Sequence, residues 1–105
     1  MSQSLGALLE ALRSRRPLIH CITNPISIND CANLILAAGG RPIMAEHPGE
    51  VAEITATAAA LAVNLGNITD VRMESMVLAG QAAREAGVPM VLDCVGAVSY
   101  THLTL

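Results

Sequence analysis

The chain has 105 residues and a net charge of −3, and 52% of it is hydrophobic while only 14% is charged. It contains no lysine, which argues against binding to nucleic acid or to an anionic membrane, because both need clustered positive charge. Its length allows one domain or part of one, with a core of aliphatic residues and methionine, since a single tyrosine is the only aromatic residue.

Cysteine usage and hydropathy indicate a cytoplasmic protein. The three cysteines, Cys21, Cys31 and Cys94, are odd in number and show no paired spacing, which favours reduced thiols. Near the N-terminus the basic residues follow the apolar ones, which is the wrong order for a secretory leader. No apolar run approaches the roughly 20 residues of a membrane span, so we expect no membrane partner.

The first half of the chain alternates helix and strand. Residues 4–14 carry leucines at helical spacing, and Pro17 prevents the helix from continuing. Residues 17–22 then predict a strand, residues 28–38 a second helix, and residues 41–45 a second strand. Two apolar strands joined by a helix form a βαβ unit with parallel strands.

The second helix has start and stop signals. The spacing of Ser27 and Asp30 predicts that Ser27 caps its start. Gly39 or Gly40 can adopt the left-handed conformation that ends it. Four residues are expected to form its apolar face: Cys31, Leu34, Ile35 and Ala38.

The same alternation continues in the second half. The expected elements are a helix at residues 49–58, a strand at 61–65, a helix at 70–86 and a strand at 89–92. Pro48 suits the first position of the third helix, and Thr69 or Asp70 can cap the fourth. The apolar side of the fourth helix is expected to comprise Val71, Met73, Met76, Val77, Ala79 and Ala83.

These patterns predict an α/β fold. The strands are almost continuously apolar, as in parallel sheets covered by helices on both faces, so three layers are expected. Ligands of such sheets bind beyond the carboxyl ends of the strands, which places any site near residues 23–27 and Met44. Residues 98–105 lack glycine, charge and a cap, and we interpret the chain as the front part of a larger domain.

Common catalytic motifs are absent from the sequence. There is no phosphate-binding loop and no G-x-G-x-x-G segment. His20 and Cys21 are neighbours on a strand and point to opposite faces, so they do not suit one metal. His47 is expected in a solvated turn, and no order or spacing selects a catalytic triad.

Two features remain as candidates. The polar loop at residues 23–27 leads into a helix N-terminus, which favours hydrogen-bond acceptors and anions, although an ordinary capped turn would look the same. Asp93 ends an apolar strand, where a carboxylate can hold Mg²⁺ or a substrate hydroxyl. A helix cap or turn aspartate is the alternative for Asp93.

Four segments carry a family resemblance: PLIHCITN, INDCANLILAAGGRPIMAE, LAVNLGNIT and VLD-x-VGA. In this order and spacing, across residues 8–97, they resemble hydroxyethylthiazole kinases. On this resemblance residues 1–97 are the N-terminal part of one kinase domain, and residues 98–105 are an unmatched tail, read as a truncation or reading-frame artefact. Cys94 also departs from the family, which often has proline there.

The resemblance implies a ribokinase-like three-layer αβα fold with a parallel sheet, incomplete here. It implies a homotrimer that uses ATP and Mg²⁺ to phosphorylate 4-methyl-5-(2-hydroxyethyl)thiazole in thiamine biosynthesis or salvage, with the thiazole pocket between subunits. Asn24, Ile26 and Met44 correspond to substrate-binding positions, and Asp93 to the Mg²⁺-side aspartate.

The remaining parts of the family's site are expected downstream. They are the adenine pocket, a second acidic metal residue and a glycine-rich anion hole with a cysteine, which none of the three cysteines here matches. No catalytic residue is therefore expected within this chain, and the isolated chain should be inactive. Two alternatives remain: a non-catalytic truncated fragment, or another ribokinase-like kinase of small alcohols, such as hydroxymethylpyrimidine kinase.

Overall fold

A computed structural model describes residues 4–95. The elements are α1 (Leu5–Arg15), β1 (Leu18–Ile22), the short 3₁₀ helix η1 (Pro25–Ser27), α2 (Ile28–Ala38), β2 (Arg41–Ile43), α3 (Val51–Thr57), β3 (Ala60–Asn64), α4 (Asp70–Ala86) and β4 (Met90–Asp93). Each expected helix and strand is present. The tail at residues 98–105 lies outside the described residues.

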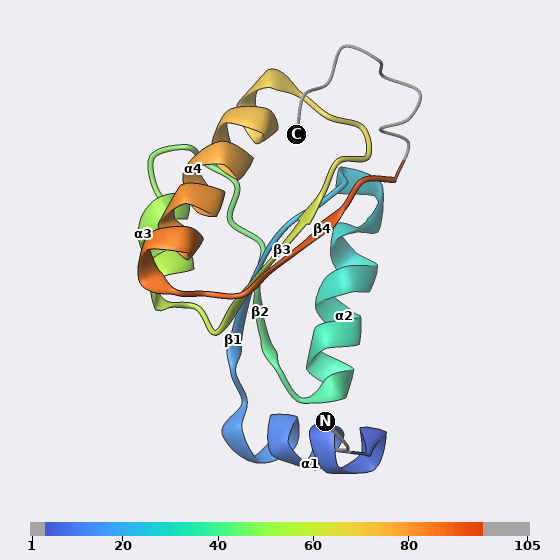
Figure 1. Ribbon diagram of the computed structural model, residues 1–105. Helices are drawn as coiled ribbons and strands as arrows, with labels where there is room; N and C mark the ends of the chain where they lie inside the picture. Colours follow the sequence, from blue (N-terminus) through green and yellow to red (C-terminus); the bar gives the residue numbers. More distant parts are fainter. Residues whose placement is uncertain (1–3, 96–105) are drawn as a thin grey trace.

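The four strands form one sheet in the order β2-β1-β3-β4, and each neighbouring pair is parallel. Helix α2 covers one face of the sheet, while α3 and α4 cover the other (Figure 1). Helix α1 lies at the amino-terminal edge of the strands, at the bottom of that view. The expected three-layer α/β fold is therefore confirmed, and the carboxyl ends of the strands share the opposite edge.

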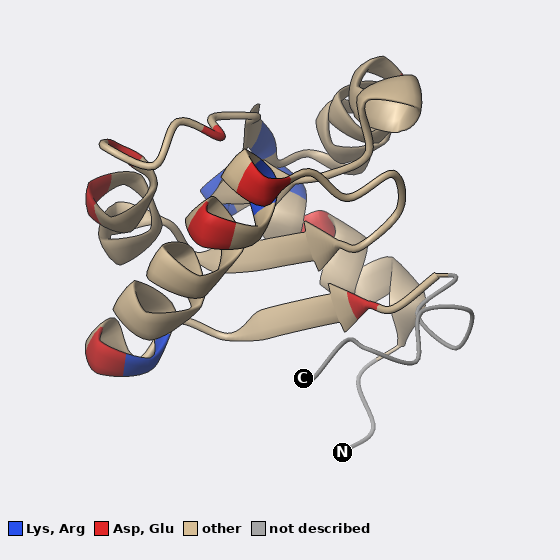
Figure 2. Cartoon of the chain, turned by 90° about the horizontal axis from the view of Figure 1, so that it is seen from above, with Lys and Arg blue, Asp and Glu red and all other residues tan. Residues whose placement is uncertain are grey.

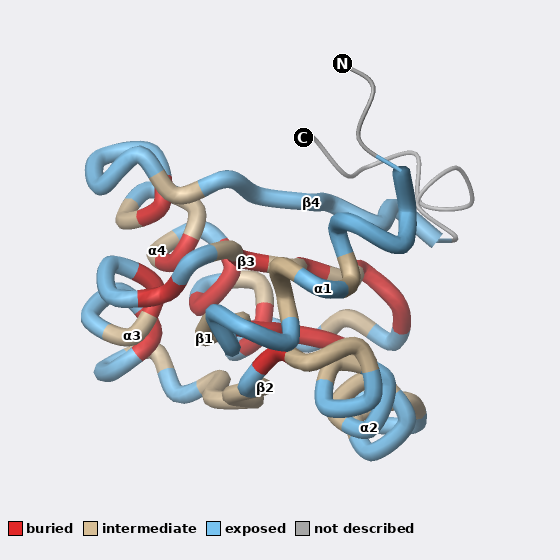
Figure 3. The backbone as a smooth tube through the Cα atoms, turned by 90° about the horizontal axis from the view of Figure 1, so that it is seen from below, coloured by how far each residue is buried: buried red, intermediate tan, exposed pale blue. Residues whose placement is uncertain are grey.

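The core lies between the sheet and the pair α3 and α4. It consists of Ile22, Val51, Leu61, Val63, Leu65, Met76, Ala79 and Ala83. Helix α2 contributes no buried residue; of its expected apolar face, Cys31, Ile35 and Ala38 are half-buried, whereas Leu34 is 71% exposed. The two faces of the sheet are thus unequally covered in the described part of the chain (Figure 3).

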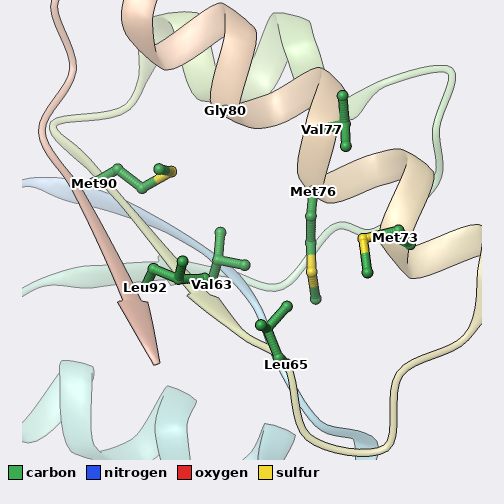
Figure 4. A pocket seen from close by; sticks show the side chains of 8 residues that line it. All are labelled: Val63, Leu65, Met73, Met76, Val77, Gly80, Met90 and Leu92. Carbon is green, nitrogen blue, oxygen red and sulfur yellow. The ribbon is translucent and has the colours of Figure 1, made fainter. Parts of the chain in front are cut away.

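Strand β4 is exposed along its whole length, as Figure 3 shows. Its side chains alternate between the faces. Met90 and Leu92 border an apolar pocket against α4, with a volume of about 220 Å³ (Figure 4). Among residues 4–95, β3 is the strand that pairs with β4, and no strand pairs with its other side.

Two element boundaries differ from expectation by two residues, and the others differ by one residue at most. Strand β2 ends at Ile43, the partner of His20, because the next carbonyl groups leave the ladder and Ala45 O accepts a hydrogen bond from His20 Nε2 instead. Helix α3 begins at Val51, so Pro48 does not occupy its first position. The backbone N–H of Gly49 donates to His47 Nδ1 at 2.9 Å, which holds these residues in a turn before the helix.

The predicted cap at Ser27 is wrong, whereas Thr69 and Gly39 have the cap roles that the sequence allows for them. The Ser27 side chain makes no capping bond to α2 and instead donates to Asn24 O at 3.3 Å, because η1 already continues into the helix. Thr69 caps α4, since its hydroxyl accepts from the Arg72 N–H at 3.1 Å. Gly39 has φ of 110°, the left-handed conformation predicted for the end of α2.

Charge is sparse over the described residues. Figure 2 looks down on the molecule and shows acidic and basic segments separated by long uncharged stretches. In residues 4–95, no helix combines the length and the hydropathy that crossing a membrane would require.

Candidate substrate-binding rim

The candidate site lies at the carboxyl edge of the sheet, where the loops that follow β1, β2 and β3 lie at the same edge as the end of β4. We call these loops, with the strand ends Asn64 and Asp93, the rim. They lie at the top of Figure 1. Parallel topology alone brings them together, since every strand ends at the same edge.

Asn24 joins two of the rim loops. Its Oδ1 accepts one hydrogen bond from the Ile26 N–H at 2.9 Å and another from Asn67 Nδ2 at 3.1 Å. The first bond shapes η1, and the second connects the loop after β1 to the loop after β3. Because both bonds use Oδ1, the Nδ2 group remains as a donor at the rim, while Ile26 is 81% exposed.

Gly66 fits closely between two asparagine side chains. Its N–H donates to Asn64 Oδ1 at 2.7 Å. A Cβ atom at this position would lie 2.9 Å from both Asn24 Nδ2 and Asn64 Oδ1, which is too short for any carbon contact. Any residue with a Cβ atom here would therefore require one of the two amides to shift.

Asp93 lies beside Asn64 on the neighbouring strand. The two residues are register partners, and Asn64 Nδ2 lies 3.5 Å from Asp93 Oδ2. The other carboxylate oxygen, Oδ1, accepts from the Val95 N–H at 3.0 Å. Asp93 is exposed, so these two donors orient a carboxylate that still faces solvent.

Met44 lies at the opposite end of the rim. It follows β2 and is half-buried, whereas Asp93 ends β4, and β1 and β3 lie between them. Three inter-strand spacings separate the two ends, about 14 Å. The structure thus places Asn64 beside Asp93, links Asn24 to the loop after β3, and puts Met44 and Asp93 at opposite ends of the rim.

His20 fixes the loop that carries Met44. The imidazole is fully buried; its Nε2–H donates to Ala45 O at 2.8 Å, so Nδ1 accepts from the Thr55 hydroxyl at 2.7 Å. Burial lowers the pKa of His20, although the Ala45 carbonyl and the Glu50 carboxylate oppose the shift. Burial thus favours the neutral imidazole, and in that form Nε2–H donates to the Ala45 carbonyl while Nδ1 accepts from the Thr55 hydroxyl.

A cavity of about 170 Å³ lies on the α2 side of the sheet, next to Asn64 and Asp93. Cys21 and Cys31 also line it. Burial raises the pKa of the Cys21 thiol, and the nearby Cys31 adds to the shift. Cys21 is therefore a poor nucleophile, and all three cysteines are free thiols, as expected.

Sequence reasoning missed several rim residues. The sequence assigns Asn64 to the end of a strand and assigns Gly66 and Asn67 to a turn, without a functional role. An amide side chain at the carboxyl end of a parallel strand is, however, a signal for a binding residue. No pattern in the sequence indicates that Arg72 and Ser75 on α4 are buried.

Comparisons with known proteins show the family of the chain. A family model described as "Hydroxyethylthiazole kinase family" matches residues 9–104. The chain belongs to this family. The resemblance in the sequence is therefore confirmed, and the matched range includes residues 98–104, beyond the described part of the chain.

Individual relatives bear the same name. Hydroxyethylthiazole kinase 2 of Clostridium botulinum is 61% identical over 87 residues, which are 83% of this chain and 33% of that protein. Hydroxyethylthiazole kinase of Alkaliphilus metalliredigens is 52% identical over 89 residues, 85% of this chain and 33% of that protein. The chain thus spans about a third of the length of these curated relatives.

A solved structure confirms the fold. The hydroxyethylthiazole kinase protein of Pyrococcus horikoshii OT3 superimposes with a TM-score of 0.81 at 43% identity. The match covers 84% of this chain and 35% of that one. The sheet and helices described above are therefore the family's ribokinase-like fold in part.

Proposed function

We propose that a protein containing this chain phosphorylates the primary alcohol of 4-methyl-5-(2-hydroxyethyl)thiazole with ATP, a step in thiamine biosynthesis or salvage. The observation that carries this proposal is the 61% identity to a relative named hydroxyethylthiazole kinase 2. The proposal concerns the whole protein, since this chain covers a third of that relative.

The rim residues supply binding and orientation in this proposal. Asn24 Nδ2 can donate to the heterocycle, because Oδ1 is already engaged within the rim. Ile26 offers an exposed apolar surface close by. Met44 has the flexible and polarizable side chain that suits a flat ring containing sulfur.

Asp93 would hold Mg²⁺. Magnesium usually takes one or two protein carboxylates and completes its shell with water and substrate phosphates, so a single oriented carboxylate fits. Within residues 4–95, no group of three or more His, Cys, Asp and Glu side chains is placed to hold a metal ion. When bound, Mg²⁺ neutralises the charge of the phosphates. The role of Asn64 is to orient the Asp93 carboxylate.

We also propose that the protein forms a homotrimer with the thiazole pocket between subunits. The family to which the chain belongs supports this proposal, because the resemblance to hydroxyethylthiazole kinases implies a trimer with the thiazole pocket between subunits. Sedimentation of the full-length protein tests the trimer, and a monomer with full activity would contradict it.

Substrate competition tests the proposed activity. The full-length protein is incubated with ATP, Mg²⁺ and an equal mixture of the thiazole alcohol and hydroxymethylpyrimidine, and both phosphorylated products are followed by mass spectrometry. We expect mainly the thiazole phosphate. Mainly pyrimidine phosphate would identify another kinase of the same fold, and no product at all would favour a non-catalytic protein.

A further inference from the structure

We infer that Arg72 and Ser75, on one face of α4, are positioning residues that hold three of the rim loops in place. The inference rests on the proposed function for its kinetic consequences, but its structural content is independent of the substrate. The first turns of α4 would thus determine the positions of the proposed substrate-binding residues.

Arg72 connects the loops after β1 and β3. Its side chain is 2% exposed, and its partners are backbone carbonyl groups. Nη1 donates to Thr23 O at 3.1 Å, and Nη2 donates to Gly66 O at 2.7 Å and also to Asn67 O. Thr23 directly precedes Asn24, so the guanidinium holds the backbone on both sides of the Asn24–Asn67 hydrogen bond.

The burial of this charge argues for a specific task. A guanidinium stays protonated, and removing it from water costs much free energy unless hydrogen bonds replace the lost hydration. The replacement is incomplete, because within the described residues Arg72 Nε is buried without a partner. An apolar side chain would fill this space at lower cost, but it could not hold two loops through three carbonyl oxygens.

Ser75 acts on the remaining loop. It is fully buried, and its Oγ donates to Glu46 O at 2.5 Å. Glu46 lies two residues after Met44, in the loop that follows β2. Because residues three apart on a helix share a face, Arg72 and Ser75 reach different loops from one side of α4.

The arrangement predicts local effects that differ between the two residues. Loss of the guanidinium should free the Asn24 and Asn67 loops, whereas loss of the Ser75 hydroxyl should free the Met44 loop. A role in general stability would instead loosen the whole domain in both cases. This difference makes the inference testable without knowledge of the substrate.

Hydrogen exchange followed by mass spectrometry tests the local effect in the full-length protein. We compare wild type with Arg72→Gln, Ser75→Ala and the control Arg84→Gln, which changes an exposed arginine of the same helix. Arg72→Gln should speed exchange in residues 23–27 and 64–68, Ser75→Ala in residues 44–47, and the control in neither. Uniform acceleration, or no change in these segments, would overturn the inference.

Arg72→Lys serves as a second variant if Arg72→Gln does not fold. Lysine keeps the charge but not the planar fork, so it cannot reach the carbonyl groups of both loops together. It should therefore loosen the same two segments. Exchange in this variant equal to wild type would show that charge alone is needed, and the inference would fail.

Enzyme kinetics provide a second measurement, which a change in global stability alone would not affect. Arg72→Gln should raise KM for the thiazole alcohol about tenfold or more, because misplacement by about an ångström is costly to binding and orientation. In an Asn24→Ala background the same change should have little further effect. Additive losses would contradict action through Asn24. Absence of thiazole phosphorylation in wild type would instead defeat the proposed function, and the exchange pattern would still judge the positioning role.

Discussion

The side-chain amide of Asn67 donates a hydrogen bond to Asn24 Oδ1 across 3.1 Å, between residues 43 positions apart in the chain. This bond joins the loops that follow the two central strands of the sheet. It also decides which end of the Asn24 amide faces outward. The position of the Asn24 amide at the rim therefore depends on a contact between two loops as well as on the strands that carry them.

Gly66→Ala should disrupt this contact. The added methyl group would meet the Asn24 and Asn64 amides at 2.9 Å, so one of them must move. We expect a loss of about 1–3 kcal/mol in the free energy of unfolding, measured with denaturant, and a raised KM for the thiazole alcohol. Gly6→Ala is the control, because its nearest atom would be 3.9 Å away. Equal behaviour of the two variants would contradict the close fit.

Much of the fold could be predicted from the sequence, since apolar runs and helical periodicity report burial directly. Thr69 and Gly39 were recognised because caps are local signals. Ser27 was misassigned because the η1 turn depends on Asn24, and the burial of Arg72 was invisible because its partners are carbonyl groups of distant loops. Such contacts follow from tertiary structure and leave no pattern in the sequence.

The candidate site was predictable only in part. Asn24, Ile26, Met44 and Asp93 came from strand ends and a family resemblance, and their functional roles remain predictions. The separation of Met44 from Asp93 depends on the strand order β2-β1-β3-β4, which periodicity does not reveal. The sequence alone predicts that both residues lie at the carboxyl edge of the sheet, but it does not give the distance between them.

His20 should make stability depend on pH. Its pKa is lower in the folded state than the value of 6.5 for a free side chain, so the unfolded chain binds more protons between these two values. Its contribution to stability is complete above about pH 6.5 and declines as the pH falls toward the lower, folded-state pKa. Denaturant unfolding across this range should show the decline in wild type and a weaker decline in His20→Gln. An unchanged slope in that variant would contradict the assignment, and His47→Gln, which changes an exposed histidine, is the control.

The two helix starts provide a matched pair of variants. Thr69→Ala removes a hydroxyl that accepts the Arg72 N–H and should lower the free energy of unfolding by about 1 kcal/mol. Ser27→Ala removes a hydroxyl with no capping bond to α2, and a smaller loss is expected. Urea denaturation of both variants measures the difference. A larger loss for Ser27→Ala would show that the cap assignments are reversed.

The isolated 105-residue chain should show no measurable kinase turnover. On the proposed function Asp93 would hold Mg²⁺, whereas the family resemblance places the second acidic residue, the adenine pocket and the glycine-rich amides outside these 105 residues. Preorganised donors of that kind are often worth about 10²–10³-fold each in rate. The purified chain is assayed by mass spectrometry for thiazole phosphate, beside the full-length protein. Equal rates would show that the catalytic half has been misplaced.

We propose that the rim of this chain forms the substrate and Mg²⁺ side of a thiazole-alcohol kinase. The most direct test measures thiazole phosphate formation by the full-length protein, comparing wild type with Met44→Ala and Asp93→Ala over a range of alcohol concentrations. We predict that Met44→Ala mainly raises KM for the alcohol, while Asp93→Ala lowers kcat more than it affects alcohol binding. Wild-type kinetics in both variants, or no product from wild type, would contradict the claim.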